Sequence, residues 1–384
     1  MTRKVCVVVT ARPSYSRIKT ALIAIREHPD LELQLVLAAS ALLDRYGRVE
    51  EQIHEDGFEV AARVFMVLEG ENPTSMAKTT GIGLLELATV MDNLRPDMVV
   101  TIADRFETMA TATAAAFMGI PLAHVQGGEV TGSIDERVRH AVTKLSDIHF
   151  PSTRQAGDRL ERMGEAPERV FVTGCPSIDL AAEAAGSRAL DFDPFTRYGG
   201  VGELLNLDEG YIVVMQHPVT TEYTDARDHA LEVLHAVDGS GLNALWFWPN
   251  VDAGSDGTSS GIRWFRENHP HARMHFFRNM APTDFLELLI HSRGIVGNSS
   301  VAIRECEFLG VPAVDIGTRQ SGRERGANVV PAGYDRGEIQ TAILAQADHG
   351  RYDSGHLYGD GLAGERIAKH LAEVELTADK RLAY

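Results

Sequence analysis

The sequence predicts an α/β protein built from two doubly wound, Rossmann-like domains that face a central cleft. Short apolar runs rich in β-branched residues alternate with longer amphipathic segments, a pattern typical of buried parallel strands and their crossover helices. The alternation lapses once, near the middle of the chain. In addition, 384 residues are more than one hydrophobic core usually holds. In such a fold, ligands bind beyond the carboxyl ends of the strands.

The first domain is predicted over residues 1–185. Its strands are expected at 5–9, 33–38, 98–102, 122–125, 148–151 and 170–173. The helical spacing of apolar residues predicts helices at 15–27, 74–94 and 106–118. The second of these helices ends before Arg95-Pro96, because proline disfavours helical backbone in the residue that precedes it.

A linker is predicted at residues 186–208, where glycine and aspartate are frequent and no periodicity is visible. The second domain is predicted over residues 209–362, after this linker. Its strands are expected at 211–215, 244–248, 274–277, 294–296 and 313–316. A terminal helix is predicted from residue 363 onward, and we expect the segment 363–384 to pack back on the first domain.

Composition argues against several classes of function. The net charge of −17 disfavours a general nucleic-acid-binding protein, and it requires any anion site to concentrate positive charge locally. The three cysteines lie far apart in apolar surroundings, which indicates buried packing rather than disulfide bonds or a zinc site. The chain begins with a strand pattern rather than a signal peptide, and no stretch predicts a membrane span. We therefore expect a cytoplasmic protein without a metal or redox cofactor.

The most informative stretch is Gly-Asn-Ser-Ser at residues 297–300, which ends an apolar strand and is expected to feed a helix over 301–308. Free backbone N–H groups and the helix dipole would make this point an anion site. Arg319 and Arg323 follow the next strand as forks suited to phosphate oxygens. Glu305 would accept hydrogen bonds from a ribose diol. The residues indicate a sugar-nucleotide diphosphate site; the alternative is an ordinary turn with two surface arginines.

Two strand ends in the first domain carry further polar residues. Residues 10–14 follow the first strand, and their small side chains would let backbone amides approach a phosphate or base, with Arg12 adding charge. The alternative is a turn with an incidental arginine. Asp104, beside Arg105, ends another buried strand, where it either caps the next helix or points into the cleft.

The densest polar cluster follows the strand at 122–125. Two consecutive glycines allow a sharp turn beside a ligand, and Glu129, Asp135 and Glu136 supply carboxylates within a dozen residues. Asp135 and Glu136 also suit the first turn of a helix, where they would complement its dipole. Three carboxylates beside two glycines exceed what helix capping requires, so this cluster favours acid–base catalysis.

The second domain contributes a histidine and a polar loop. His217 stands directly before a proline at the end of the domain's first strand, where it suits a phosphate contact or a proton transfer. The alternative is a structural histidine. The loop 249–255, which includes Asn250, lies at the next strand end and is expected to hold the same side of the ligand.

These motifs, in this order, resemble those of the UDP-N-acetylglucosamine 2-epimerases, and the hydrolysing branch is most similar. The resemblance runs from residue 10 to the terminal helix and rests on ADRFET, HVQGGEVTGSIDERVRHAVTKLSDIHF, TGCPSID, HPVTTE, PNVDAGS, GNSSVAIRE, GTRQSGRE and LYGDG. It implies a GT-B fold, no cofactor, and a homodimer or homotetramer that acts on a UDP-sugar, with neither nucleic acid nor membrane as partner.

The resemblance also implies roles for individual residues. In the first domain, Asp104, Glu129 and Asp135 would carry the chemistry, together with His217 of the second domain beside the departing diphosphate. The residues implied around UDP and the sugar are Arg12, Ser14, Arg105, Asn250, Asn298, Ser299, Ser300, Glu305, Arg319, Gln320 and Arg323. Glu305 would bind the ribose, and the serines and Arg319 would bind the phosphates.

The implied reaction converts UDP-N-acetylglucosamine, or a modified relative, to an N-acetylmannosamine-type sugar and UDP. The string HPVTTE favours this hydrolysing branch over the non-hydrolysing one, in which arginine usually follows this histidine. Three places depart from the family pattern: Ala41 replaces a histidine, Ile102-Ala103 stands where the family has His-Gly before Asp-Arg, and Gln126 stands where relatives often have glutamate or histidine. The alternatives are a non-hydrolysing epimerase, a GT-B glycosyltransferase and a non-catalytic UDP-sugar-binding protein.

Overall fold

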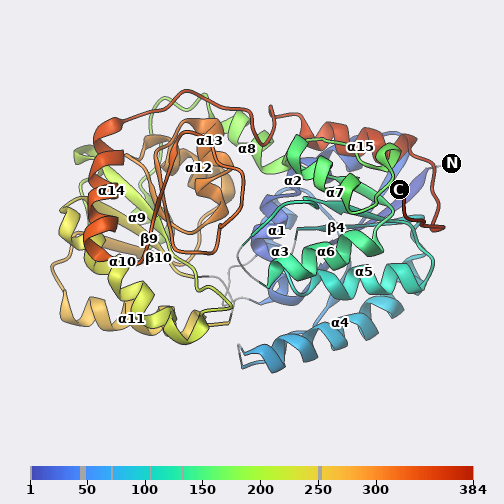
Figure 1. Ribbon diagram of the computed structural model, residues 1–384, viewed down its shortest axis with the longest axis horizontal. Helices are drawn as coiled ribbons and strands as arrows, with labels where there is room; N and C mark the ends of the chain where they lie inside the picture. The colour runs from blue at the N-terminus through green and yellow to red at the C-terminus, as the bar shows by residue number, and fades with distance from the viewer. Residues whose placement is uncertain are drawn as a thin grey trace. The chain divides into compact units, whose positions relative to one another are not determined.

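The structure is a computed structural model that describes residues 2–43, 49–70, 72–103, 105–131, 134–249 and 253–383. The chain divides into two compact units (Figure 1). The first unit comprises Met1–Val130, Ile134–Leu180 and Tyr358–Tyr384, and the second comprises Thr131–Ser133 and Ala181–Leu357. Each unit is built on a predominantly parallel sheet with helices on both faces. The prediction of two Rossmann-like α/β domains is therefore confirmed.

The sheet of the first unit has six parallel strands in the order β3-β2-β1-β4-β5-β6. This is the strand order of the dinucleotide-binding fold, in which the order reverses between β1 and β4. The strands are β1 Arg3–Val9, β2 Leu31–Ala38, β3 Val60–Val64, β4 Met98–Ile102, β5 Leu122–Val125 and β6 Ile148–Phe150. Except in the edge strand β3, the central residues of these strands are mostly buried, which explains why their sequences are largely continuous apolar runs.

Helices cover both faces of this sheet. They are α1 Arg12–Ser16, α2 Lys19–Glu27, α3 Val49–Glu55, α4 Pro73–Leu94, α5 Thr108–Phe117, α6 Asp135–Leu145, α7 Arg154–Arg162, α8 Pro176–Ala184 and α15 Ala363–Glu373. On one face, α15 packs against α2 and shares its core, so the end of the chain belongs to the first unit. On the other face, α5 lies between α4 and α6. The Asp179 carboxylate accepts hydrogen bonds from the first two amides of α15, which ties that helix to α8.

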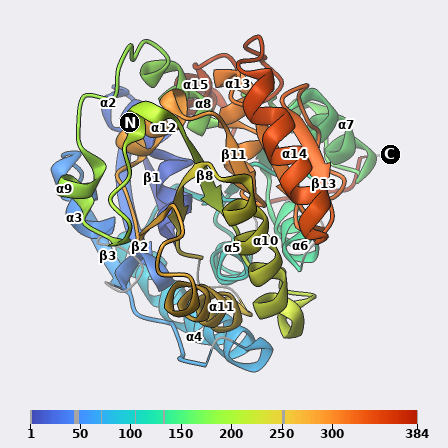
Figure 2. The ribbon, with the colours of Figure 1, turned by 90° about the vertical axis from the view of Figure 1, so that its left-hand side faces the viewer.

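The sheet of the second unit has seven strands in the order β13-β12-β11-β8-β9-β10-β7 (Figure 2). They are β7 Val201–Gly202, β8 Tyr211–Met215, β9 Asn243–Phe247, β10 Met274–Phe277, β11 Ile295–Gly297, β12 Ala313–Ile316 and β13 Val329–Ala332. All pairs are parallel except that of β10 with the short edge strand β7. The segment 186–208, predicted as a linker, contains β7 and lies within the second unit.

The helices of the second unit are also shared between two faces. They are α9 Pro194–Tyr198, α10 Ala226–Ser240, α11 Ser255–Asn268, α12 Pro282–His291, α13 Glu305–Leu309 and α14 Arg336–His349. One face is covered by α10, which packs against both α11 and α14 (Figure 2). The opposite core receives side chains from α12, α13 and the segment around α9. None of the helices in the described ranges of either unit is long and apolar enough to span a membrane.

Several predicted elements differ from the observed ones. The helix predicted at 15–27 is interrupted between α1 and α2, and the strand predicted at 170–173 forms only an isolated bridge between Val170 and His149. The strands β3, β7 and β13 were not predicted. All three are edge strands with exposed residues. β3 alternates between exposed and less exposed positions, β7 has only two residues, and β13 contains a proline, so none is a long buried run like the central strands.

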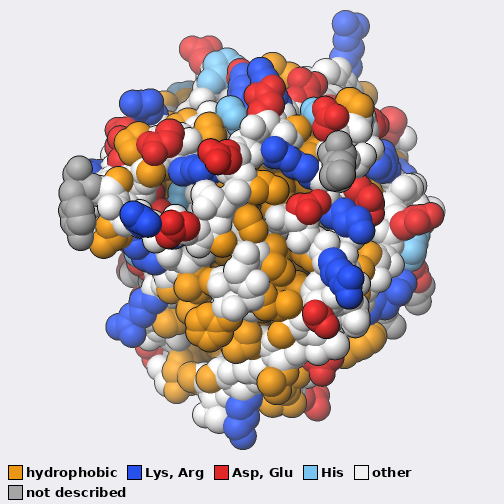
Figure 3. All heavy atoms as spheres, turned by 90° about the vertical axis from the view of Figure 1, so that its right-hand side faces the viewer, with side chains coloured by type: hydrophobic (Ala, Val, Ile, Leu, Met, Phe, Trp, Pro, Cys, Tyr) orange, Lys and Arg blue, Asp and Glu red, His pale blue; other side chains and the backbone are white. Residues whose placement is uncertain are grey.

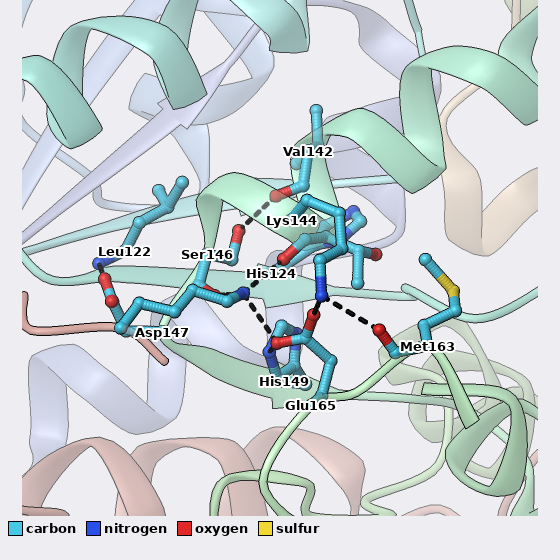
Figure 4. Close-up of polar contacts among 11 residues, drawn as sticks. Leu122, His124, Val142, Lys144, Ser146, Asp147, His149, Met163 and Glu165 are labelled. Carbon is cyan, nitrogen blue, oxygen red and sulfur yellow. Dashed lines mark hydrogen bonds and ion pairs between the residues drawn. The ribbon is translucent and has the colours of Figure 1, made fainter. Parts of the chain in front are cut away.

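A buried ionic cluster holds the C-terminal tail on the first unit (Figure 4). The Glu165 carboxylate is 2% exposed and accepts hydrogen bonds from His149 at 2.8 Å and Lys144 at 2.6 Å. Lys380, in the tail, lies 2.6 Å from the same carboxylate. Burial alone raises the pKa of Glu165, but these three partners outweigh it and lower the pKa to about 2. The tail is therefore anchored through a charge that remains ionised at neutral pH.

Candidate functional site

The candidate residues of the second unit gather where three neighbouring strands end. β11 lies between β8 and β12, and Gly297 at its end is in register with Met215 of β8 and Asp315 of β12. The loops that leave these three strands therefore start side by side at one edge of the sheet. His217, Asn298 and Arg319 stand in the three loops, one in each.

Asn298 joins the first two loops. Its side-chain oxygen accepts a hydrogen bond from the His217 backbone N–H, and its side-chain amide donates to the His217 carbonyl, both at 2.8 Å. The Asn298 residue is fully buried and His217 is 3% exposed. Because two hydrogen bonds act on one residue, the backbone of His217 is fixed in both position and orientation.

Asn298 also joins the third loop through its own backbone. Its carbonyl oxygen accepts hydrogen bonds from Gln320 Nε2 at 2.8 Å and from Arg319 Nη1 at 3.2 Å. Gln320 Oε1 in turn accepts from Arg323 Nη1 at 2.7 Å. The structure thus brings five of the predicted residues into one hydrogen-bonded network, and two of the five are arginines.

A buried carboxylate lies at the base of this network. Asp315 is in β12, and its Oδ2 is 2.6 Å from Nη2 of Arg325, which also approaches the Gln320 carbonyl at 3.4 Å. Burial raises the pKa of Asp315 to about 6, although Arg325, Arg323 and Arg319 each lower it. Asp315 therefore lies beside three guanidinium groups, and guanidinium groups are well suited to bind the oxygens of a phosphate.

Sequence analysis did not select Asp315 or Arg325. A signal for each was present, because Asp315 interrupts the apolar strand Ala313–Ile316 and Arg325 continues the run of arginines that begins at Arg319. Their importance depends on the loop after β12 folding back over the strand, which no local pattern indicates.

The helix predicted over 301–308 is present only from residue 305 onward. Residues Ser300–Ala302 form a 3-10 turn, and α13 begins only at Glu305 and has five residues. The β-branched residues Val301 and Ile303 favour this break, because their side chains crowd the preceding turn of an α-helix. A helix dipole at Gly297 therefore contributes little, and the anion site rests on the arginines and the Asn298 network instead.

The serines and the glutamate of this segment are nevertheless at the strand end. Ser299 and Ser300 are 6% and 5% exposed, and Ser299 Oγ accepts a hydrogen bond from the Val301 amide at 3.4 Å. Glu305 is buried, and within the described ranges no group donates to its Oε2. A buried carboxylate oxygen without a donor is costly, so a ligand hydroxyl group would be favoured there.

In the first unit, the loop after β5 makes a tight turn. Gln126 has φ +69° although it is not glycine, and Gly128 has φ +77°. A Cβ atom on Gly128 would lie 2.3 Å from the carbonyl oxygen of Ala156 in α7, so only glycine fits. The Gln126 side-chain amide donates to Cys175 Sγ at 3.0 Å. This position therefore carries a neutral, buried hydrogen-bonding group in place of an acid.

The turn after β5 ends at Glu129, which α6 holds in place. Glu129 is 3% exposed, and its carbonyl oxygen accepts a hydrogen bond at 2.9 Å from Arg139, whose side chain is fully buried. Arg139 also pairs with Glu136 at 3.0 Å, and Glu136 contacts His140 at 2.9 Å. Asp135 is the first residue of α6. Two of the three predicted catalytic carboxylates, Glu129 and Asp135, are thus linked by one helix.

The remaining candidates are placed as follows. Ser14 is 2% exposed in α1, and Arg105 is paired with the buried Glu107 through two nitrogen–oxygen contacts of 3.0 and 3.2 Å. Asp104, Asn250 and the side chain of Arg12 lie outside the described part of the structure. Among the described residues, no group of three or more His, Cys, Asp or Glu side chains is arranged to hold a metal ion.

Comparisons with known proteins identify the family of this chain. The sequence model of the family described as UDP-N-acetylglucosamine 2-epimerase matches residues 23–372. A Neisseria meningitidis protein named UDP-N-acetylglucosamine 2-epimerase is 30% identical over 387 residues, covering 99% of this chain and 98% of that protein. A Legionella pneumophila protein named UDP-N,N'-diacetylbacillosamine 2-epimerase (hydrolyzing) is 30% identical over 376 residues, covering 98% and 97%.

A solved structure shares the fold. The crystal structure of Methanocaldococcus jannaschii UDP-GlcNAc 2-epimerase in complex with UDP-GlcNAc and UDP aligns with a TM-score of 0.78. The alignment covers 96% of this chain and 99% of that one, at 16% sequence identity. The expected GT-B-type pair of Rossmann-like domains is therefore confirmed.

The raised pKa of Asp315 makes a prediction about stability. A carboxyl group with a folded pKa near 6 and an ordinary pKa of 3.8 adds stability below pH 3.8 that is lost as the pH rises through 6. We expect the wild type to lose about 1 kcal/mol between pH 5 and 7.5 from this group. Asp315→Asn, which stays neutral, should lack this loss. Urea unfolding followed by tryptophan fluorescence reports on the second unit, because Trp246, Trp248 and Trp264 all lie there.

The matched control is Asp228→Asn, since the Asp228 side chain is 80% exposed and should leave the pH dependence unchanged. If the stability of Asp315→Asn changed with pH as much as that of the wild type, the loss of stability could not be attributed to the raised pKa of Asp315.

Proposed function

We propose that this chain, which belongs to the UDP-N-acetylglucosamine 2-epimerase family, is a hydrolysing 2-epimerase of a UDP-linked N-acetylhexosamine. Its products would be UDP and a free sugar of the N-acetylmannosamine type. The observation that carries the proposal is the presence of two kinds of strand-end site: arginine side chains in one unit, and in the other a turn and helix that carry the buried Glu129 and the partly buried Asp135. The similarity over nearly the full length to a relative named as hydrolysing supports the assignment to the hydrolysing branch of the family.

The second unit would bind UDP. Arg319 and Arg323 are suited to the diphosphate, because guanidinium groups donate paired hydrogen bonds to phosphate oxygens. His217, fixed by Asn298, would contact the same group. Glu305 has a buried oxygen that the ribose hydroxyls would satisfy. As negative charge develops on the departing UDP, this preorganised positive site would stabilise the transition state.

The first unit would carry out proton transfer. The hydrogen on carbon 2 of the sugar is not acidic, because no carbonyl group adjoins that carbon. Departure of UDP from carbon 1, taking the bonding electron pair, builds positive charge there and acidifies carbon 2. A carboxylate then removes the carbon-2 proton, which leaves a 2-acetamidoglucal with a double bond between carbons 1 and 2.

Hydration would complete the reaction. Water adds its hydroxyl group to carbon 1, and a proton is delivered to the opposite face of carbon 2, which inverts that centre. Two faces require at least two proton-transfer groups. We assign them to Glu129, Asp135 and Asp104, with Glu129 as base or activator of water. Gln126 cannot accept a proton as a carboxylate would, so it is assigned to hydrogen bonding rather than to proton transfer.

Turnover in heavy water tests the reaction. We expect UDP-N-acetylglucosamine, or its 4-acetamido analogue, to give UDP and a free mannosamine-type sugar with deuterium at carbon 2. Proton NMR identifies both the product and the label. An intact UDP-N-acetylmannosamine would establish the non-hydrolysing reaction instead. Free sugar without deuterium would exclude elimination, and binding of UDP-sugar without any turnover would indicate a non-catalytic binding protein.

Substitutions should separate residues needed for proton transfer from residues needed for UDP binding. Glu129→Gln, Asp135→Asn and Asp104→Asn are each expected to lower kcat by about 100-fold or more while the Kd for UDP changes less than about threefold. Arg319→Gln should raise the Kd for UDP by about tenfold, the loss of one charge-assisted hydrogen bond. Isothermal titration calorimetry and initial rates measure both effects. Arg336→Gln is the control, because Arg336 is half exposed and pairs with Glu232.

We also propose a homodimer formed through the first unit. Apolar side chains gather on the face of this unit shown in Figure 3. The largest exposed ones on the neighbouring helices α4 and α5 are Leu85, 72% exposed, and Phe117, 82% exposed. An apolar surface of this kind on an otherwise acidic protein favours a self-complementary contact between two copies.

Light scattering after size exclusion tests this interface. The wild type should show at least twice the chain mass of 41.9 kDa. Phe117→Glu, which places a charge in the contact, should shift the protein to the monomer mass. Glu86→Gln on α4 serves as a control for a change of surface charge on that helix. A wild-type protein that is monomeric at micromolar concentration would overturn the proposal.

A further inference from the structure

One buried histidine in the first unit has no place in the reaction outlined above. His124 is in the middle of β5 and is fully buried. Its Nε2 lies 2.8 Å from the carbonyl oxygen of Ala103, and its Nδ1 lies 3.3 Å from Thr143 Oγ1 on α6. Since a carbonyl oxygen only accepts hydrogen bonds, Nε2 carries the proton, and in the neutral ring Nδ1 accepts from the threonine hydroxyl. His124 is thus held in one tautomer and one orientation.

His124 makes its first contact with Ala103, the residue that precedes Asp104 in the sequence. Ala103 has φ +63°, a conformation that residues other than glycine seldom adopt. Its backbone N–H donates to the Val125 carbonyl at 2.9 Å, and its carbonyl accepts from His124. Both backbone groups of this unusual residue are therefore bound to β5, and the second of them is bound to the histidine ring.

His124 also lies close to the glycine turn that leads to Glu129. A Cβ atom on Gly127 would lie 2.9 Å from His124 Nδ1 and 3.2 Å from Thr143 Oγ1. The turn after β5 therefore passes so close to the His124–Thr143 pair that residue 127 has no room for a side chain. The His124 ring thus lies between this turn and Ala103.

Helix α6 connects Thr143 to a further carboxylate, that of Asp135. Thr143 lies eight residues after Asp135 on α6, and Arg139, midway between them, donates to the Glu129 carbonyl. These three positions, each four residues apart, share one stripe of the helix. Lys380 of the tail donates to the Thr143 carbonyl at 2.9 Å, which braces the far end of α6.

From these contacts we propose that His124 is a positioning residue that sets the relative placement of the carboxylates assigned to proton transfer. The proposal rests on the function proposed above. His124 itself exchanges no proton with the substrate. It acts by holding Ala103 and the glycine turn at fixed positions against Thr143, because a displacement of about 1 Å is enough to slow a reaction about 100-fold.

Three variants test the proposal once the wild type has been shown to release UDP from the sugar nucleotide. His124→Phe keeps the ring but loses both hydrogen bonds, and should lower kcat about 100-fold while the Kd for UDP changes less than about threefold. His124→Gln keeps a donor that can reach the Ala103 carbonyl, and should recover at least tenfold of that loss. Thr143→Val removes only the donor to Nδ1, and should lower kcat about tenfold.

His149 offers a matched control. It is the register partner of His124 on the adjacent strand β6 and is equally buried, but its ring contacts Glu165 rather than a turn. His149→Phe should lower the Tm while kcat stays within about threefold of the wild type.

The outcomes separate the two proposals. A wild type without turnover defeats the proposed function and with it this inference. A wild type with turnover, combined with a folded His124→Phe protein of near-normal kcat, defeats the inference alone. Equal losses of kcat in His124→Phe and His149→Phe would show general destabilisation and would also overturn it. If His124→Phe does not fold, an unchanged kcat in Thr143→Val overturns the positioning role.

Discussion

The contacts of Asn298 hold together the candidate anion site. A loop that leaves a parallel strand has no hydrogen-bonded neighbour beyond the sheet, so its backbone groups need partners from elsewhere. The Asn298 side chain supplies two such partners to His217, and its carbonyl receives Arg319 and Gln320 from the opposite side. Because β11 is the middle strand of the three, a single residue there can fix all three loops.

The arginines of this site are close together, although like charges repel. The buried carboxylate of Asp315 beneath them, and the neutral amide of Gln320 between them, make this arrangement possible. Three arginines thus gather around one carboxylate in a protein whose overall charge is −17. A diphosphate is the kind of ligand that such a group of arginines would bind.

The candidate residues of the first unit also lie at strand ends, but their requirement is different. Its carboxylates must be placed accurately rather than surrounded by positive charge, and they leave strand ends whose turns include left-handed residues at Ala103, Gln126 and Gly128. Such turns persist only when the surroundings hold them. The buried side chains of His124 and Arg139 contact two of these turns, whereas the separate cluster around Glu165 anchors the C-terminal tail.

The periodicity of apolar residues and the order of the motifs were enough to predict the fold, most of the central strands and the family of this protein. The central strands were predictable because strands buried on both faces are continuous apolar runs, and the α/β alternation together with the ordered motifs was enough to identify the fold and the family. The helix predicted over 301–308 is observed only from Glu305 onward, because the spacing of apolar residues did not show that Ser300–Ala302 form a 3-10 turn instead.

Only the tertiary structure decided which polar residues act together. Asp315, Arg325 and His124 are visible in the sequence as polar residues beside or within apolar strands, yet their partners lie between 5 and 21 residues away, or on another element. Such contacts depend on strand order and on how loops fold back over the sheet edge. Strand order results from the packing of the whole domain, so local sequence determined the elements of this protein, whereas the long-range packing determined its site.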